Sequence, residues 1–310
     1  MNPFHAAILR ALPLVPRSVV RRIAGRYIAG ETRDDLLRVL AALGRTGLLS
    51  TVDLLGENVG SKEEARRAAE EYLRLVEDLS SSGMHSEISL KLTQLGLRSS
   101  EPFAAELLEE IVVASEERKL RVCIDMEDSS TTDATLRIFR RLRERHDGVR
   151  VAIQAYLRRS SSDVSALLPL APAIRVCKGI YAEPPELAFE GRRSVRENFL
   201  RLVTLLLDGG GYPAIATHDP WLVDRCLRLL ESRGTKSESH EFQMLLGVGE
   251  ALRPRLRAAG SALRLYCPYG PHWYEYSIRR LRENPRMTGY VLKTLFSPKV
   301  FSRGHLERTA

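Results

Sequence analysis

Long polar side chains recur where short apolar segments of this 310-residue chain end. They are Asp53, Glu57, Lys91, Asp125, Glu127, Gln154, Arg175, Lys178, Thr217, His218, Gln243 and Tyr266. Burying such groups costs free energy unless each one is paired or hydrogen-bonded. Any single residue could form a structural ion pair, but so many at equivalent positions predict a polar, ligand-filled site. The cations among them suit an anionic ligand that carries a diphosphate or a carboxylate.

Two sets of residues could instead hold a metal ion, namely Asp125, Glu127 and Asp128, and His218, Asp219 and His240. The first set offers the oxygen ligands that Mg²⁺ prefers. The second set has neither HxH nor HExxH spacing. Because Lys91, Arg175 and Lys178 fall on neighbouring segment ends, we favour an anionic ligand and expect no metal site.

A second candidate feature is the segment WYEYSIRRLRENP at 273–285. On a helix, Tyr276 lies one turn before Arg279 and Arg280, so the three side chains share a face. Two adjacent guanidinium groups beside a tyrosine could clamp a carboxylate through charge-assisted hydrogen bonds. The alternative is an ordinary solvated basic face, since Arg282 and Arg286 continue the run, and composition alone favours that alternative.

Eight short apolar segments predict strands, at 48–55, 86–92, 120–126, 149–156, 173–179, 213–218, 241–246 and 262–268. Most are rich in Val, Ile, Leu and Ala with little alternation, as in strands that are covered on both faces. Helical patterns separate them, and Ser61 with Glu64 forms a capping-box pattern at the start of one. We therefore predict an α/β fold, a distorted (β/α)₈ barrel with extra N-terminal helices.

A doubly wound open sheet is the competing fold. It is disfavoured because no predicted strand is followed by GxGxxG, and GVGEAL at 247–252 lacks the third glycine. The chain has no linker, fixed-period repeat or low-complexity tract. We expect a helical lead-in at 1–47, a barrel at 48–296 and a basic tail at 297–310.

The formal net charge of +8 is concentrated at the two ends of the chain. Residues 1–30 hold five Arg and no acid, and residues 251–310 hold twelve Lys or Arg and three Glu, so 31–250 is net acidic. Nucleic-acid binding is disfavoured, because aromatic residues are only 6% and no basic and aromatic stripe is visible. An amphipathic N-terminal segment that docks on the domain or on a membrane surface fits better.

The compartment can also be predicted. Cys123, Cys177, Cys226 and Cys267 are widely spaced without a CxxC pair, which is typical of buried thiols in a reducing compartment. No run approaches 18 apolar residues, and Arg10 interrupts the N-terminal apolar stretch, so we expect neither a spanning helix nor a signal peptide. We expect a cytoplasmic protein with a peripheral contact at the inner face of the membrane as a further hypothesis.

Taken together, eight segments resemble the proline dehydrogenase family in that family's order. They are SLKLTQLGL (89–97), CIDMED (123–128), AIQAYLRR (152–159), RVCKGIY (175–181), ATHD (216–219), EFQMLLGVGE (241–250), LRLYCPYG (263–270) and YSIRRLRENP (276–285). The match runs from about Asp53 to Pro285. The combination of RVCKGIY with a closing YxxRRxxE is specific, although no single piece is.

The resemblance implies a distorted barrel that binds FAD without a dinucleotide fingerprint. It implies oxidation of L-proline to 1-pyrroline-5-carboxylate by hydride transfer to flavin N5, the first step of proline degradation to glutamate. The electrons would pass to a membrane quinone. Without the second catalytic domain that some relatives carry, the enzyme would be monofunctional and would release its product or hand it to a separate pyrroline-5-carboxylate dehydrogenase.

The resemblance also assigns roles position by position. The proline carboxylate would be held by Arg279, Arg280 and Lys91, and the ring would be lined by Leu245, Tyr266 and Tyr276. Asp125 would anchor the cations, and Arg175 would lie beside flavin N5. Flavin contacts would come from Met126, Gln154, Arg175, Lys178, Gly179, Ile180, Thr217 and His218. The loop PYGPHWYE varies in the family, so the packing over the substrate does not transfer.

Two alternatives from other classes remain open at this point. One is a different barrel enzyme that binds a phosphorylated substrate through Arg175 and Lys178. The other is a basic, non-catalytic protein that uses its two ends on a membrane or on nucleic acid.

Overall fold

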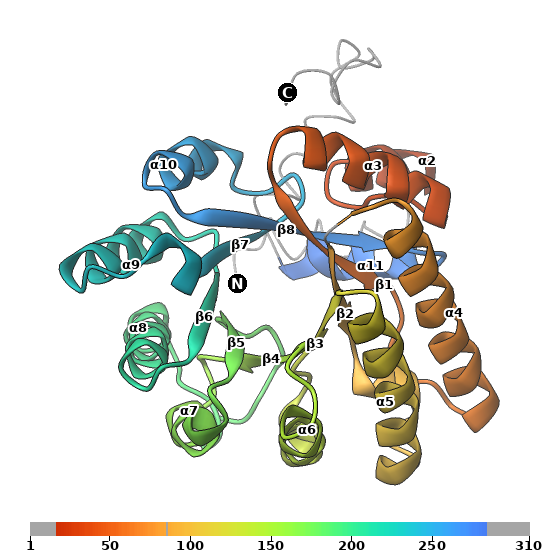
Figure 1. The fold of residues 1–310 in the computed structure, drawn as a ribbon, viewed down its shortest axis with the longest axis horizontal. Coiled ribbons are helices and arrows are strands. Elements are labelled where there is room, and N and C mark those ends of the chain that lie inside the picture. Colours follow the sequence, from red (N-terminus) through yellow and green to blue (C-terminus); the bar gives the residue numbers. More distant parts are fainter. Residues whose placement is uncertain (1–16, 85, 284–310) are drawn as a thin grey trace, which may run out of the picture.

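The computed structural model describes residues 17–84 and 86–283 (Figure 1). Its strands are β1 (Leu49–Leu54), β2 (Ser86–Leu90), β3 (Arg121–Ile124), β4 (Val149–Gln154), β5 (Ala173–Cys177), β6 (Tyr212–Ala216), β7 (Glu241–Leu245) and β8 (Ala262–Tyr269). Each pairs in parallel with the next, and β1 pairs with β8, which closes the sheet into a barrel. The predicted barrel is confirmed, and every predicted strand range overlaps one observed strand.

Helices accompany the strands, and most of them lie on the outer side of the barrel (Figure 1). They are α2 (Arg17–Ala24), α3 (Arg33–Arg45), α4 (Lys62–Ser81), α5 (Glu101–Glu117), α6 (Ser129–Arg143), α7 (Ser160–Leu167), α8 (Arg192–Asp208), α9 (Pro220–Ser232), α10 (Arg253–Ala258) and α11 (Trp273–Glu283). The helices α2 and α3 lie within the predicted lead-in. Residues 1–16 and 284–310, on which parts of the predicted lead-in, barrel and tail fall, lie outside the described residues.

The strands are buried along nearly their whole length, and their two faces differ in polarity. Val52 and Ile88, which are fully buried, belong to the core that also includes helix residues. The positions that alternate with them, such as Glu87, point to the opposite face. Glu87 on β2 bonds Arg175 on β5, and since these strands are not neighbours the contact must cross the barrel interior. The prediction that the strands are covered on both faces is confirmed, and the face toward the barrel interior is largely polar.

Two helix starts show how local sequence sets element boundaries. Ser61 caps α4 by accepting the Glu64 N–H, as predicted, but the Glu64 carboxylate accepts the N–H of Gly60 at 2.8 Å. The predicted capping box is therefore only half formed. A complete box instead opens α3, where Thr32 and Asp35 satisfy each other's backbone N–H groups.

The eighth helix position around the barrel, between α10 and α4, is filled by α3 (Figure 1). The segment before α3 is tied to β8, since Ala29 N–H donates to the Pro268 carbonyl and Gly270 N–H to the Gly30 carbonyl. The last helix, α11, instead packs against α2 through Tyr276 and Trp273, which share a core cluster with Val20. The distortion we predicted thus consists of an N-terminal helix that takes the place of the last one.

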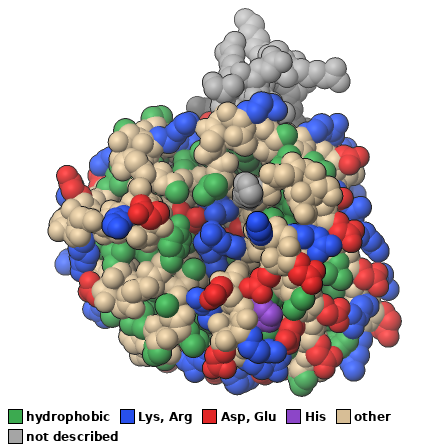
Figure 2. Space-filling model, in the orientation of Figure 1, with side chains coloured by type: hydrophobic (Ala, Val, Ile, Leu, Met, Phe, Trp, Pro, Cys, Tyr) green, Lys and Arg blue, Asp and Glu red, His purple; other side chains and the backbone are tan. Residues whose placement is uncertain are grey.

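Surface charge is mixed over the face in Figure 2, where acidic and basic side chains are interspersed and Lys and Arg gather at the centre. Within residues 17–84 and 86–283, none of the helices combines the length and apolar character that crossing a lipid bilayer requires. All four cysteines are free thiols, three of them buried and Cys177 half-buried.

Candidate active site

Eight charged side chains in the barrel interior form one chain of contacts in which the sign of charge alternates. From the strand C-termini inward, the order is Asp53, Lys91, Asp125, Arg175, Glu87, Arg150, Glu241 and Arg264. Successive N···O distances are between 2.6 and 3.4 Å. None of these side chains is more than 14% exposed. The interior charges therefore compensate one another at contact distance, which offsets the cost of burying them.

Asp125 is the centre of the part of this chain that lies nearest the strand ends. Its carboxylate accepts from Arg175 Nη1 at 2.6 Å, from Ser89 Oγ at 2.8 Å and from the Tyr266 hydroxyl at 2.8 Å. Lys91 Nζ lies 3.4 Å away. The guanidinium carbon of Arg175 also lies 5.2 Å from the centre of the Tyr266 ring. The structure thus brings together four residues that the sequence singled out: Lys91, Asp125, Arg175 and Tyr266.

The protonation of this group follows from its contacts. Burial alone would raise the pKa of Asp125, but Lys91 and Arg175 outweigh it and hold the pKa below its usual value. Burial alone would lower the pKa of Lys91, but Asp53 and Asp125 raise it above its usual value. Burial raises the pKa of Asp53. Lys91 is therefore a cation and Asp125 an anion at neutral pH.

Arg175 is held from four directions. Its Nε donates to Gln243 at 2.7 Å, Nη1 to Ser89 and Asp125, and Nη2 to Glu87 at 2.8 Å. A guanidinium has five N–H donors. These four bonds leave one N–H, on Nη2, for a ligand, so Arg175 is fixed in place and has little capacity for additional partners.

A second charged cluster lies at the C-terminal ends of β5 and β6. The buried carboxylate of Asp219 accepts from Lys178 at 2.7 Å and from Arg196 at 2.6 and 2.8 Å, and Arg192 lies 3.5 Å away. Burial would raise the pKa of Asp219, but Arg196 and Lys178 lower it strongly. Three cations share one carboxylate, so this end of the barrel carries surplus positive charge.

Gly179 and Ile180 follow directly after β5. Gly179 has a φ of +102°, and a Cβ there would lie 1.9 Å from the Tyr156 ring. The positive φ and the nearby Tyr156 ring therefore explain why this position is a glycine, without any ligand. Ile180 is one of the exposed large apolar residues, at 50%. The flavin contacts that we predicted for both residues remain predictions.

The ends of β6 and β7 are tied to each other. His218 Nε2 accepts the N–H of Leu245 at 2.7 Å, so a neutral ring carries its proton on Nδ1. The Thr217 N–H donates to the Gln243 carbonyl, and its hydroxyl accepts from the Asp219 N–H at 3.1 Å. Hydrogen bonds to β7 thus fix both Thr217, through Gln243, and His218, through Leu245.

Gln154 and Met126 lie at the ends of β4 and β3. The Gln154 amide donates to the Glu127 carbonyl at 2.8 Å, which fixes its orientation and leaves the amide oxygen as an acceptor. Met126 is buried. The Glu127 carboxylate binds the backbone N–H and the hydroxyl of Thr93, and burial raises its pKa.

These contacts argue against both metal alternatives. In the first set, the Glu127 carboxylate binds Thr93, and Asp128 caps α6 and pairs with Arg98. In the second set, the His240 ring binds the Ser261 hydroxyl and the Lys236 carbonyl. His240 directly precedes β7, whereas His218 and Asp219 follow β6, so they lie at opposite ends of the barrel. Within the part of the chain that the structure describes, no three His, Cys, Asp or Glu residues gather as a ligand set.

The tyrosine and arginine pair that we placed on a helix does lie on α11. Tyr276 is buried in the cluster that joins α11 to α2. The side chains of Arg279 and Arg280 lie outside what the structure describes, so the carboxylate clamp remains a prediction.

Sequence reasoning missed several residues near or below this site, Ser89, Arg192 and Arg196 among them. Tyr181 interacts electrostatically with Lys91, and burial raises its pKa strongly. Glu87, Arg150, Glu241 and Arg264 continue the interior charge chain. The two-residue spacing of Glu87, Ser89 and Lys91, or of Glu241 and Gln243, is the signal that could have found them, because alternate residues of a strand share a face.

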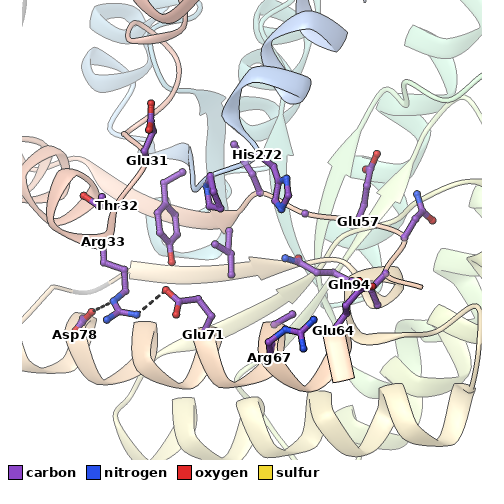
Figure 3. Close-up of a pocket in the computed structure, with 18 of the residues that line it drawn as sticks. Glu31, Thr32, Arg33, Glu57, Glu64, Arg67, Glu71, Asp78, Gln94 and His272 are labelled. Atoms are coloured by element: carbon purple, nitrogen blue, oxygen red, sulfur yellow. Dashed lines mark hydrogen bonds and ion pairs between the residues drawn. The ribbon is translucent and has the colours of Figure 1, made fainter. Parts of the chain in front are cut away.

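A cavity of about 900 Å³ lies on the outer flank of the barrel, between α3, α4 and the loops after β1 and β8 (Figure 3). Arg33 is held there between Glu71 and Asp78, at 2.7 and 2.6 Å. Of the predicted site residues, Glu57 alone is among its described lining. This cavity is therefore distinct from the interior site.

Comparisons with known proteins agree on one family. The proline dehydrogenase family model matches residues 36–292. Proline dehydrogenase 1 of Bacillus subtilis (strain 168) is 36% identical over 270 residues, which is 87% of this chain and 89% of the relative. Proline dehydrogenase of Deinococcus radiodurans is 34% identical over 282 residues, 89% of this chain and 91% of the relative.

Solved structures agree on the fold. Proline utilization A (PutA) from Bdellovibrio bacteriovorus, inactivated by N-propargylglycine, superposes with a TM-score of 0.80 at 26% identity over 90% of this chain. This chain spans about a third of that protein, 34%. A PutA mutant from Bradyrhizobium japonicum, at 23% identity and a TM-score of 0.73 over 92% of this chain and 35% of the mutant, supports the fold alone.

The alternative of a non-catalytic basic interaction protein is wrong, since the matched relatives are oxidoreductases that align over nearly nine-tenths of the chain. Arg175 and Lys178, which the phosphorylated-substrate alternative placed on one phosphate, bind different carboxylates. With a family model matched from α3 to beyond α11 on a closed barrel, this chain belongs to the proline dehydrogenase family.

Proposed function

We propose that this protein oxidises L-proline to 1-pyrroline-5-carboxylate with non-covalently bound FAD, as the first step of proline degradation to glutamate. The observation that carries the proposal is the group of Lys91, Asp125, Arg175 and Tyr266 at the strand ends, bonded to one another within a barrel of the matched family. Such a group offers fixed charges to a zwitterionic substrate and to a cofactor beside it.

The residues at the ends of β3 to β7 fit a flavin dinucleotide. The cations Lys178, Arg192 and Arg196 together carry more charge than the single carboxylate of Asp219. This excess of positive charge suits a diphosphate. Gln154 keeps an acceptor oxygen, and the exposed Ile180 supplies apolar surface. The residues that would hold the group are the predicted Met126, Gln154, Arg175, Lys178, Gly179, Ile180, Thr217 and His218, together with Arg192 and Arg196.

The substrate would be held by its carboxylate and its ring. Arg279, Arg280 and Lys91 would clamp the carboxylate, which orients the ring. Leu245, Tyr266 and Tyr276 would wall the ring methylenes. Because the pKa of Asp125 is held low by Lys91 and Arg175, its carboxylate is a weak base. Asp125 would therefore anchor the cations, and the amine of proline must lose its proton to another acceptor, such as water.

Bound at this site, FAD would accept the hydride at N5 and pass the electrons to a quinone. Arg175, with one N–H left on Nη2, would place positive charge beside the electron-rich reduced ring. The product would leave for a separate pyrroline-5-carboxylate dehydrogenase.

We place the protein in the cytoplasm with a peripheral contact at the inner face of the membrane, where a quinone is available. The support is the charge of the two chain ends. Deleting residues 1–30 would not test this cleanly, because Val20 and Ala29 contact the domain. Replacing Arg17 and Arg21 by Gln should weaken binding to anionic vesicles by about 1 kcal/mol per Arg. Unchanged binding would remove the idea.

The proposal is tested by anaerobic spectroscopy. Purified protein, supplied with FAD, should show the flavin absorbance band near about 450 nm, and L-proline should bleach it. D-proline is the matched control and should leave the band largely intact. A protein that takes up no FAD, or whose bound flavin ignores L-proline, would refute the proposed function.

A further inference from the structure

Glu87 lies at the second residue of β2, below the proposed site, and its side chain is 1% exposed. Oε1 accepts from Arg175 at 2.8 Å and from the Thr51 hydroxyl at 3.0 Å, and Oε2 lies 3.0 Å from Arg150. One carboxylate thus joins the cation nearest the site to a cation nearer the other end of the barrel.

Among the described residues, Arg175 is the cation of the proposed site that the Glu87 carboxylate contacts. Arg175 faces two anions, Asp125 at 2.6 Å and Glu87 at 2.8 Å. Asp125 also accepts hydrogen bonds from Lys91 and Tyr266 and lies among the residues at the strand ends. Glu87 has no such contacts, so its charge subtracts from the positive field of Arg175 without touching a ligand.

The negative charge of Glu87 is shared between two cations, Arg175 and Arg150. Arg150 binds both Glu87 and Glu241, and Glu241 binds Arg264. Because the interior is water-poor, a change of one unit of charge in this chain is weakly screened. The balance at Arg175 therefore depends on how strongly Arg150 competes for Glu87.

We propose that Glu87 is a positioning residue that holds the Arg175 guanidinium in place and sets how much positive charge it presents to the bound flavin. This inference rests on the proposed function, since it requires FAD beside Arg175. Removing the Glu87 charge should make the surroundings of the flavin more positive and stabilise its reduced, electron-rich form. The midpoint potential of the bound flavin should then rise.

The test compares midpoint potentials of flavin-loaded variants by equilibration with a reference dye. Glu87→Gln keeps the length of the side chain and an oxygen for Arg175 but removes the charge. We expect the ratio of reduced to oxidised flavin at a fixed ambient potential to rise about tenfold, which for a two-electron couple is about 30 mV. Glu241→Gln is the matched control, because it removes an equally buried carboxylate whose ion pairs are with Arg150 and Arg264 and which reaches Arg175 only through the neutral Gln243. It should lower stability but change that ratio less than threefold.

A second variant keeps the test decisive if Glu87→Gln does not fold. Arg150→Met removes the competing cation, so more of the Glu87 charge opposes Arg175, and the potential should fall instead of rise. The inference would be overturned if Glu87→Gln and Glu241→Gln shifted the midpoint potential equally. It would also be overturned if Glu87→Gln or Arg150→Met bound a flavin that proline reduces but kept the wild-type potential. A wild-type protein without flavin would instead refute the proposed function, which separates the two failures.

Discussion

The ring of Tyr156 occupies the space beside Gly179 that a side chain at that position would need. The same glycine has a φ of +102°, where residues with a Cβ are strained. The sequence associates Gly179 with close approach to a ligand, whereas its immediate neighbour is a protein side chain. Packing alone would therefore retain a glycine at this strand end.

Gly179→Ala should lower the free energy of unfolding by more than the 1–3 kcal/mol (roughly) that backbone strain alone costs. The matched control is Gly191→Ala, because Gly191 also has positive φ (+85°) but no atom within 4 Å of the point where its Cβ would lie. Urea unfolding measures both. If the two substitutions cost the same, the Tyr156 ring moves aside freely and the packing explanation fails.

At the scale of elements, α2 packs on α11 and so supports the helix that carries Arg279 and Arg280. Val20 on α2 is fully buried and belongs to one cluster with Trp273 and Tyr276. The lead-in is therefore part of the proposed substrate site, in addition to any role of its positive charge at a membrane.

Val20→Ser should loosen α11 and raise the KM for proline several-fold, while the unfolding free energy falls by about 2 kcal/mol or more. Steady-state kinetics with a dye acceptor and a thermal melt separate the two effects. The control is Val113→Ser on α5, at a position that is 41% exposed, and it should change neither quantity. An unchanged KM for Val20→Ser would show that α11 holds its position without α2.

The sequence predicted the barrel well because the outer face of each strand is apolar and a helical pattern separates each pair. It did not predict that α3 fills the eighth helix position, since that depends on the contact of Ala29 with Pro268, far away in the chain. It placed Lys91, Asp125, Arg175 and Tyr266 together because the C-terminal ends of parallel strands meet at one end of a barrel. It missed Glu87 and its partners because each lies within the first three residues of its strand, away from the C-terminal ends where we expected the site, and only the closed barrel shows that they pair across the interior.

Over the whole molecule, the interior charges make stability depend on pH. Burial would raise the pKa of Glu241, but Arg264 and Arg150 lower it from its usual 4.5 to about 2. A carboxylate with a depressed folded-state pKa contributes stability that is present above its unfolded pKa and is lost as pH falls toward the folded one. The barrel should therefore weaken between about pH 4.5 and 2.

The Glu241 contribution corresponds to about 3 kcal/mol at neutral pH, from a shift of about two and a half pH units. Glu241→Gln should be less stable than the wild type at pH 7, and its unfolding free energy should depend less on pH below about 4.5. Denaturant titrations at several pH values measure this, with the exposed Asp147→Asn as the control (its side chain is 101% exposed). Parallel curves for Glu241→Gln and the wild type would contradict the assignment.

The seam between β1 and β8 joins residues that are far apart in sequence, as in the bond from Arg264 to the Ser50 carbonyl, 214 positions away. A ribosome therefore has to release nearly the whole barrel before its first strand can find its last. Until then α3 lacks the β8 surface that it covers, and the paired charges of β7 and β8 have no closed interior to enter. During synthesis, the incomplete barrel would expose both the edge of β1 and the apolar face of α3, which makes this step the one at which chaperone binding would be most effective.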